Sequence, residues 1–205
     1  MKLIRSSVFA GFAIGCAGFG FLASGIQSQV YGSLFGSILF SFGLLTVVGY
    51  KLALYTGTAG FIRKNEIGQL FTILGGNILG CLLMALIARV SPMDIQGAAQ
   101  RILELRMKTG PVRCGILGIG CGFMMTTAVT FARRQQYLPL LFAVPLFIVC
   151  GFTHCIADAF YYLCVPVTFL KANALKVIIV YLCIVLGNLI GCNLYRIILD
   201  RSQIV

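Results

Sequence analysis

The sequence predicts an all-α integral membrane protein in which six transmembrane spans form an inverted 3+3 repeat, with the second and fifth spans broken. The first observation is composition: 60% of the residues are hydrophobic and 10% are charged, whereas soluble domains have about 25% charged residues. The second is length, because a membrane helix needs about 20 apolar residues and six such segments fill the 205 residues. The third is that two of these segments are too long for one straight helix and carry glycine near their middle.

The first three spans are expected over residues 6–24, 31–61 and 67–88. The first is rich in glycine, which lets helix backbones approach closely in lipid. The second is interrupted at Gly49, Tyr50 and Lys51, so we expect two half-helices joined by a non-helical loop. Such a break is tolerated in a membrane only where protein buries it or where it lines a cavity. The third span contains a Gly-Asn motif that begins at Gly76.

The last three spans are expected over residues 111–132, 137–166 and 174–199. The connection before them holds a polar helical stretch at residues 97–108, which we expect to lie at the membrane interface. The fifth span is interrupted at Cys150 and Gly151, and the sixth contains a second Gly-Asn motif at Gly187.

The two halves of the chain resemble each other. A shift of 102 residues places Phe40 on Phe142 and Gly49 on Gly151, so that the two breaks coincide. We therefore expect one transmembrane domain over residues 1–205, with repeat halves of about 1–90 and 111–205. Three spans per half require the halves to have opposite orientation. Inverted repeats with a broken helix in each half are typical of transporters, with the site at the midplane between the breaks.

His154 is the strongest candidate for a functional residue. It is the single histidine of the chain and lies inside the fifth span, with Asp158 four residues later and so on the same helix face. An ionisable group inside a membrane span is costly, which makes it a functional-site hypothesis by default. Its ordinary pKa of about 6.5 lies near physiological pH. The alternative is a structural histidine that bonds the backbone of the broken helix.

Charge and cysteine content limit the other kinds of site. The net charge of +11 is expected from basic residues that flank membrane spans, and it adds a field that draws anions. Nucleic-acid binding is not expected, because no soluble basic domain is present. The nine cysteines form no Cys-x-x-Cys motif, and with one histidine they offer no zinc set. We expect them to pack as small apolar residues, and we expect neither a metal nor a cofactor.

Two stretches together resemble signatures of the formate/nitrite transporter family. Phe40-Ser-Phe-Gly-Leu-Leu followed by Leu54-Tyr-Thr-Gly57 is similar to the second span and the Leu-Phe-Thr-Gly signature of the family. Gly151-Phe-Thr-His-Cys-Ile-Ala-Asp158 is similar to its Gly-Phe-Glu-His-Ser-Ile-Ala-Asn signature. The resemblance covers nearly the whole chain. It implies an aquaporin-like homopentamer of the cell (inner) membrane, with cytoplasmic termini, whose subunits each conduct small monovalent anions of weak acids: formate, nitrite or hydrosulfide.

The resemblance also implies roles for particular residues. His154 matches the central pore histidine, which would donate a hydrogen bond or a proton to the anion, and Thr56 matches the loop threonine that faces it. Five residues match apolar constrictions of the pore: Phe40, Leu44, Leu54, Tyr55 and Phe147. Lys51, Lys108 and Asp158 are candidates for attracting or orienting the anion, and Lys108 matches the family's lysine across a gap.

The chain departs from the family pattern at five positions. Tyr55 stands for phenylalanine, Thr153 for glutamate, Asp158 for asparagine and Ile119 for asparagine, and Lys51 stands where a small residue is usual. These departures leave the substrate and the handling of protons open. Basic residues divide almost evenly between the two sides of the predicted membrane, so charge alone does not fix the orientation.

Two other classes of function compete with an anion channel. A channel for small neutral solutes could have the same architecture. An intramembrane thiol enzyme could use Cys155 with His154 and Asp158, but adjacent helical residues do not face each other. We therefore expect no enzyme activity.

Overall fold

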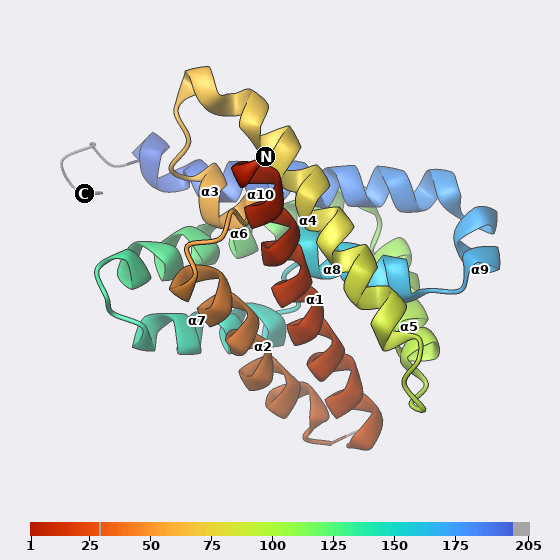
Figure 1. The fold of residues 1–205 in the computed structure, drawn as a ribbon. Helices are drawn as coiled ribbons and strands as arrows, with labels where there is room; N and C mark the ends of the chain where they lie inside the picture. Colours follow the sequence, from red (N-terminus) through yellow and green to blue (C-terminus); the bar gives the residue numbers. More distant parts are fainter. Residues whose placement is uncertain (29, 199–205) are drawn as a thin grey trace.

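The computed structural model describes residues 1–28 and 30–198, and within them every regular element is a helix (Figure 1). The elements are α1 (Lys2–Gln27), α2 (Gly32–Gly49), α3 (Tyr55–Ala59), the short 3-10 helix η1 (Lys64–Glu66), α4 (Ile67–Ala88), α5 (Ile95–Thr109), α6 (Pro111–Arg133), α7 (Leu138–Val149), α8 (Cys155–Cys164), α9 (Val167–Ala172) and α10 (Ala174–Ile198). The predicted all-α class is confirmed. Leu199, the expected end of the sixth span, lies outside the described residues.

Five helices are long and apolar enough to cross a membrane: α1, α2, α4, α6 and α10. Two shorter apolar helices, α7 and α8, belong to the stretch that the sequence predicts as the broken fifth span. Phe35, Phe42 and Phe71 are exposed on the outer surface. In contrast, Asn77 and Asn188 are fully buried. Extended apolar exposure is unfavourable in water, so this distribution fits a molecule whose outer surface contacts lipid or other subunits.

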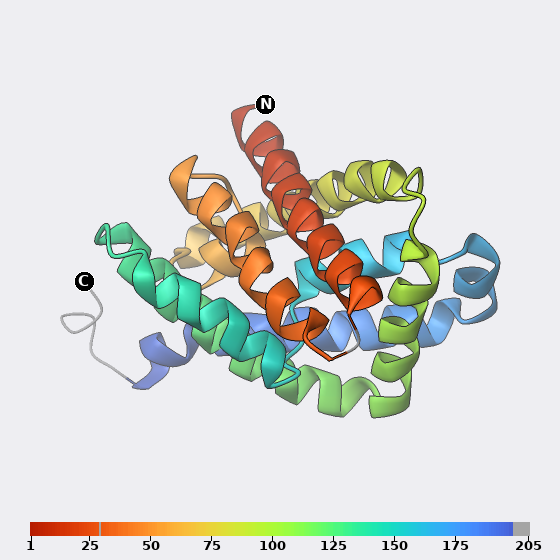
Figure 2. The same cartoon turned by 90° about the horizontal axis from the view of Figure 1, so that it is seen from below.

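The long helices pack in two groups. Figure 1 shows α1 between α2 and α4, and Figure 2 shows α6 running alongside α10. Glycine permits these close approaches, because a Cβ atom on Gly11 of α1 would collide with the carbonyl oxygen of Asn77 in α4. A Cβ atom on Gly122 of α6 would collide in the same way with Asn188 in α10. The two close approaches correspond in sequence, because Gly122 lies 111 residues after Gly11 and Asn188 lies 111 residues after Asn77.

Both predicted interruptions are present, and their backbones have the same conformation. The Lys51 N–H donates to the carbonyl of Val48 at 3.1 Å, and the Gly151 N–H donates to the carbonyl of Ile148 at 2.9 Å. Both residues have a left-handed backbone conformation, with φ of 53° at Lys51 and 70° at Gly151. We call residues 50–54 and 150–154 the first and second break loops.

This match corrects the expected register of the repeat. The break loops correspond at a shift of 100 residues rather than 102, since Lys51 and not Gly49 is the counterpart of Gly151. Gly49 is the last residue of α2 and corresponds to Val149. The sequence comparison paired two glycines, whereas the structure pairs the two left-handed positions, one of which is a lysine.

The polar connection forms a packed helix rather than one that only rests at an interface. Asp94 is the N-cap of α5, and its carboxylate accepts a hydrogen bond from the Gly97 N–H at 2.9 Å, which favours the start of a helix. It packs against α8 and also contacts α1, α6 and α10. Ala99 and Leu103 are fully buried on its inner face. This packing brings the C-terminal turn of α5 to the second break loop.

Candidate functional site

A buried asparagine holds each break loop in place. The side-chain amide of Asn77 donates to the carbonyls of Ser7 at 2.7 Å and Ala53 at 2.9 Å. Its oxygen accepts from the N–H of Tyr55 at 2.8 Å. The bonds to Ala53 and Tyr55 satisfy backbone groups that the interruption of the helix leaves without partners, which matters because unpaired polar groups are costly away from water. The bond to Ser7 ties the asparagine to α1.

Asn188 does the same for the second break loop. Its amide donates to the carbonyls of Gly118 and Thr153, both at 2.9 Å, and its oxygen accepts from the N–H of Cys155 at 2.8 Å. The two Gly-Asn motifs of the sequence are therefore anchors for the breaks. Their role was not predicted, although their repetition was visible.

Two thiols, one in α10 and one in α4, each connect a long helix to the half-helix of the opposite break. Cys192 of α10 donates to the carbonyl of Thr56 in α3 at 3.3 Å. The thiol of Cys81 in α4 lies 3.4 Å from the carbonyl oxygen of Ile156 in α8 and 3.3 Å from that of Gly11 in α1. These contacts position the first turns of α3 and α8, where the candidate polar side chains lie.

His154 caps α8 and contacts Thr56. Its Nδ1 accepts a hydrogen bond from the N–H of Ala157 at 3.1 Å, so Nδ1 carries no hydrogen and the hydrogen of the neutral ring is on Nε2. Nε2 lies 3.0 Å from Oγ1 of Thr56. In this tautomer the Nε2–H donates to Oγ1, which leaves the hydroxyl hydrogen of Thr56 free for another acceptor. The histidine thus bonds the backbone with one nitrogen and a polar side chain with the other.

Apolar side chains surround this contact. The ring of Phe147 stacks on His154 with centroids 5.8 Å apart, and Phe40 meets Phe147 edge-on at 6.2 Å. Leu44 and Leu54 are buried in the same core. Tyr55 is also buried, and its hydroxyl donates to the carbonyl of Val185 at 3.5 Å. An ion that approaches the Thr56–His154 contact from the side of Phe40 and Phe147 would therefore meet aromatic faces.

A cavity of about 170 Å³, which we call the Arg106 cavity, lies beside the second break loop. His154, Phe40 and Phe147 line it together with Arg106 and Asp158. Nε of Arg106 is 3.2 Å from Oδ1 of Asp158, and their side chains are 15% and 1% exposed. Nη1 of Arg106 also donates to the carbonyl of Gly151 at 3.4 Å.

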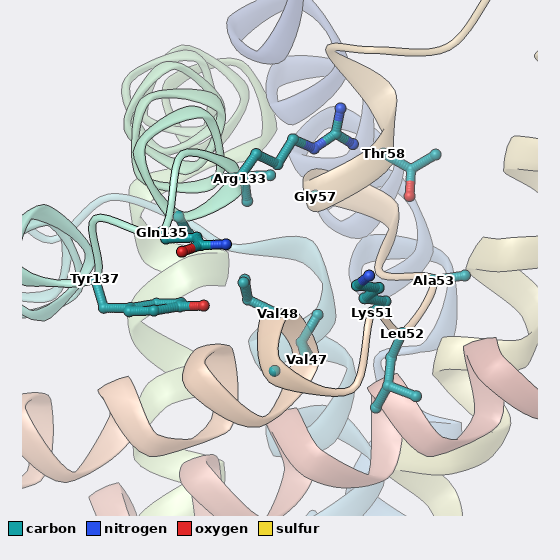
Figure 3. Close-up of a pocket in the computed structure, with 13 residues that line it drawn as sticks. Val47, Val48, Lys51, Leu52, Ala53, Gly57, Thr58, Arg133, Gln135 and Tyr137 are labelled. Atoms are coloured by element: carbon teal, nitrogen blue, oxygen red, sulfur yellow. The ribbon is translucent and has the colours of Figure 1, made fainter.

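A larger cavity of about 630 Å³, the Lys51 cavity, lies beside the first break loop (Figure 3). Figure 3 shows Gln135 and Tyr137 pointing into it from the turn between α6 and α7, with Lys51 across from them. Thr58 of α3 and Arg133 of α6 also line it. The guanidinium of Arg133 lies 3.7 Å from the centroid of the Phe61 ring. Two cationic side chains, Lys51 and Arg133, line this cavity, and none of the other residues that line it carries a carboxylate.

The structure brings four of the ten candidate residues together. His154, Thr56, Phe147 and Phe40 form one continuous cluster. Lys51 lines the other cavity, and the carboxylate of Asp158 faces Arg106 on α5 and not the imidazole. The functions assigned to these residues stay predictions.

Lys108 is exposed on α5 and is not among the residues that line either cavity. Arg106, two residues earlier, is the basic side chain that reaches the site, and it was missed. The sequence held a signal, because Arg106 follows the apolar Leu103 by three residues in the expected helical stretch, and residues at that spacing share a helix face.

Comparisons with known proteins agree with the fold. A family model described as "Formate/nitrite transporter" matches residues 1–199. A solved "Pentameric formate channel with formate bound" is 20% identical, with a TM-score of 0.81 over 95% of this chain and 93% of that one. An "FNT family ion channel" is 18% identical, with a TM-score of 0.76 over 95% of this chain and 86% of that one. No curated protein matches the sequence.

Proposed function

Because the chain belongs to the formate/nitrite transporter family, we propose that it is a membrane channel or transporter for small monovalent anions of weak acids, namely formate, nitrite or hydrosulfide. Each subunit of a homopentamer would carry its own path in the cell membrane, with both termini in the cytoplasm. In this proposal α2 with α3 and α7 with α8 are the two broken spans among six. The halves 1–90 and 111–205 form one inverted repeat, as in other transporters with paired broken helices.

The observation that carries the proposal is the Thr56–His154 contact of 3.0 Å. The two residues come from different broken spans. The rings of Phe147 and Phe40, which we call the aromatic wall, adjoin the contact. We propose that the path leads from the Lys51 cavity through this contact to the Arg106 cavity. An anion loses hydration in an apolar passage, which is unfavourable unless hydrogen bonds replace the lost water. The free hydroxyl hydrogen of Thr56 supplies one such bond, and the Nε2–H of His154 supplies a second when the anion takes the place of Oγ1 of Thr56 as its acceptor.

The contacts of His154 favour hydrogen-bond donation over the transfer of its own proton. Releasing the Nε2 proton from the neutral ring requires another proton on Nδ1, and Nδ1 already accepts the N–H of Ala157. A proton on Nδ1 would displace this bond and leave the first turn of α8 without its cap. The same two bonds argue against the thiol enzyme, because neither ring nitrogen is available to the thiol of Cys155.

Uptake by liposomes that contain the purified protein tests the proposal. The variant His154→Asn suits the test because asparagine is also a good N-cap, so α8 should keep its first turn while the imidazole is lost. We expect anion uptake to fall at least about tenfold, the loss that removal of about 1.4 kcal/mol of stabilisation produces. Unchanged uptake at every pH would reject the role of His154 in the path.

Thr56 provides a matched pair of variants. Thr56→Ser keeps the hydroxyl and should keep most of the uptake, whereas Thr56→Val has nearly the same shape and should lose it. Swelling of the same liposomes in glycerol and in potassium salts tests the neutral-solute and cation alternatives. The aromatic wall beside His154 disfavours both, because such channels need a polar path.

A further inference from the structure

An apolar groove lies between α4 and α10, apart from the two cavities beside the break loops. It has a volume of about 250 Å³, and every residue that lines it, from Ile78 of α4 to Leu182 of α10, is aliphatic or aromatic. Tyr162 of α8 and Tyr181 of α10 line it together, with ring centroids 6.1 Å apart. Ile178 and Leu182 are 55% and 53% exposed at its edge. We call it the α4–α10 groove, and its exposed edge admits a molecule from the membrane.

The α4–α10 groove extends along the membrane-spanning helices from one end of the molecule. Val177 and Leu182 line it and lie about 5 and 12 Å along α10 from its first residue, at a rise of about 1.5 Å per residue. The hydrocarbon core of a bilayer is about 30 Å thick, so the groove reaches through much of one leaflet. This position and the apolar lining fit the acyl chain of a lipid.

Arg89, which follows α4, lies beside the groove and has no carboxylate partner. Its Nη2 donates to the carbonyls of Leu163 at 2.8 Å and Val165 at 3.1 Å, at the end of α8. Leu163 also lines the groove. Nε of Arg89 has no hydrogen-bond partner among the described residues, and the ion pairs within these residues are those of Arg101 and Arg106. A half-buried cation without a counter-ion is unfavourable, so this position favours a bound anion.

A second space, the Arg89 cavity, has a volume of about 440 Å³ and a polar lining. Arg89, Pro166 and the first turn of α5 line it. The carboxylate of Asp94 also lines it, but Asp94 is 3.8 Å from Arg101 and so has its own cation. Leu163 lines the groove and Pro166 lines the cavity, so the two spaces adjoin the turn between α8 and α9 and suit the two parts of one amphiphile.

The surroundings of this turn are basic. Lys171 and Lys176 are exposed, and each is next in sequence to a residue that lines the groove. Residues 159–199 contain no aspartate or glutamate. Figures 1 and 2 show α9, which carries Lys171, at the same end of the molecule as the end of α4, which Arg89 follows. Basic pockets between membrane helices bind anionic lipid headgroups.

We propose that the α4–α10 groove and the Arg89 cavity together bind one anionic phospholipid, with an acyl chain in the groove and the phosphate on the guanidinium of Arg89. A lipid accounts for both spaces, whereas a free phosphate would leave the apolar groove empty. The bound headgroup supplies the counter-ion that Arg89 lacks and links the end of α4 to the turn between α8 and α9. This inference does not depend on which anion the path conducts.

The chain contains no tryptophan, so a single introduced tryptophan reports on the groove. Ile178→Trp places an indole at the edge of the groove. Leu186→Trp is the matched control, because Leu186 lies on the same helix and is 57% exposed but does not line the groove. Each full-length protein is reconstituted in phosphatidylcholine with increasing fractions of a lipid that carries bromine on its acyl chains, either phosphatidylglycerol or phosphatidylcholine. Bromine quenches tryptophan fluorescence on contact.

We expect half-maximal quenching of Ile178→Trp at a fraction of phosphatidylglycerol at least about fivefold below that of phosphatidylcholine, or about 1 kcal/mol, the attraction typical of one basic residue. Leu186→Trp should respond to both lipids at equal fractions. In the Ile178→Trp protein, Arg89→Gln keeps a donor for the α8 carbonyls but removes the charge, so it should lose most of the preference. Arg101→Gln should keep it, because Arg101 is paired with Asp94 and lines neither space.

Three results would overturn the inference. One is equal quenching of Ile178→Trp by the two lipids, a result that stands even if Arg89→Gln does not assemble. Another is an assembled Arg89→Gln protein that keeps the full preference for phosphatidylglycerol. The third is weak quenching of Ile178→Trp by both lipids with normal quenching of Leu186→Trp, which would show that a neighbouring subunit covers the groove.

Discussion

The two break loops share a backbone but differ in chemistry. Both have a left-handed residue at the same position, and both are held by a buried asparagine. The first carries Lys51 there and borders a cavity of about 630 Å³ with a second cation, Arg133. The second carries Gly151 and borders a cavity of about 170 Å³ in which Arg106 is paired with Asp158. The comparison indicates that the two breaks share a backbone conformation, while a few side chains make the two cavities beside them unequal.

Removing either asparagine should have the largest effect on stability. Asn77→Ala and Asn188→Ala each leave two backbone groups at a break without partners, one carbonyl and one N–H. At about 1–3 kcal/mol per group, each variant should lose at least about 2 kcal/mol of folding free energy. Denaturant unfolding in detergent measures this loss.

Asn173→Ala is the control, since the side chain of Asn173, the residue that follows α9, bonds only the carbonyl of Phe169 in that helix. If the two breaks are built alike, the Asn77 and Asn188 variants should lose similar amounts. A loss at one site that is no greater than that of the control would show that the breaks are held differently.

A carboxylate in the Lys51 cavity should make the two ends more alike. Thr58 lines that cavity and corresponds to Asp158 at the shift of 100 residues. Thr58→Asp should weaken the attraction for anions and raise the half-saturating formate concentration about fivefold, or about 1 kcal/mol. Uptake measured against formate concentration gives this value. Thr58→Asn adds a similar volume without charge, and an equal shift in this variant would point to blockage instead of electrostatics.

Substitutions at the two positions with a left-handed backbone should change the stability of the protein in opposite directions. A left-handed conformation costs a residue with a side chain about 1–2 kcal/mol relative to glycine. Lys51→Gly should therefore stabilise the protein by about 1 kcal/mol and slow uptake at low formate concentrations, because it removes a cation from the cavity. Gly151→Ala should destabilise it by a similar amount. Thermal unfolding in detergent checks both signs, and a destabilised Lys51→Gly protein would contradict the match between the loops.

The thiol contacts should give the smallest effect. Cys81→Ala and Cys192→Ala each remove one buried thiol donor that lies within hydrogen-bond distance of a half-helix carbonyl. We expect each to lose about 1 kcal/mol, near the average for one hydrogen bond. Cys150→Ala serves as control because Cys150 is exposed. A loss at Cys81 or Cys192 equal to that of the control would mean that these thiols act only as packing.

Much of the helical framework follows from the sequence. The expected span 67–88 coincides with α4, because a continuous apolar run between charged turns leaves few other boundaries. The breaks at Gly49–Lys51 and Cys150–Gly151 were predictable, since glycine or charge interrupts an apolar segment that is too long for one helix. The cluster of His154, Thr56 and Phe147 was named only through the family resemblance, since 98 residues separate Thr56 from His154.

The remaining features depend on tertiary structure. The register of the repeat could not be read correctly, because nothing in the sequence marks Lys51 as a left-handed residue. Arg106 is 52 residues from Asp158, so their ion pair requires the packing of α5 on α8. Helix α9, which follows Pro166, was also not predicted.

A cryo-electron microscopy map of the protein in lipid nanodiscs with formate is the most direct test of the proposed path. The same map of the His154→Asn protein serves as its reference. We predict formate density within hydrogen-bond distance of Oγ1 of Thr56 and Nε2 of His154 in the wild type, and its loss in the variant. Formate density found only between subunits, or equally strong at this position without the imidazole, would contradict the account.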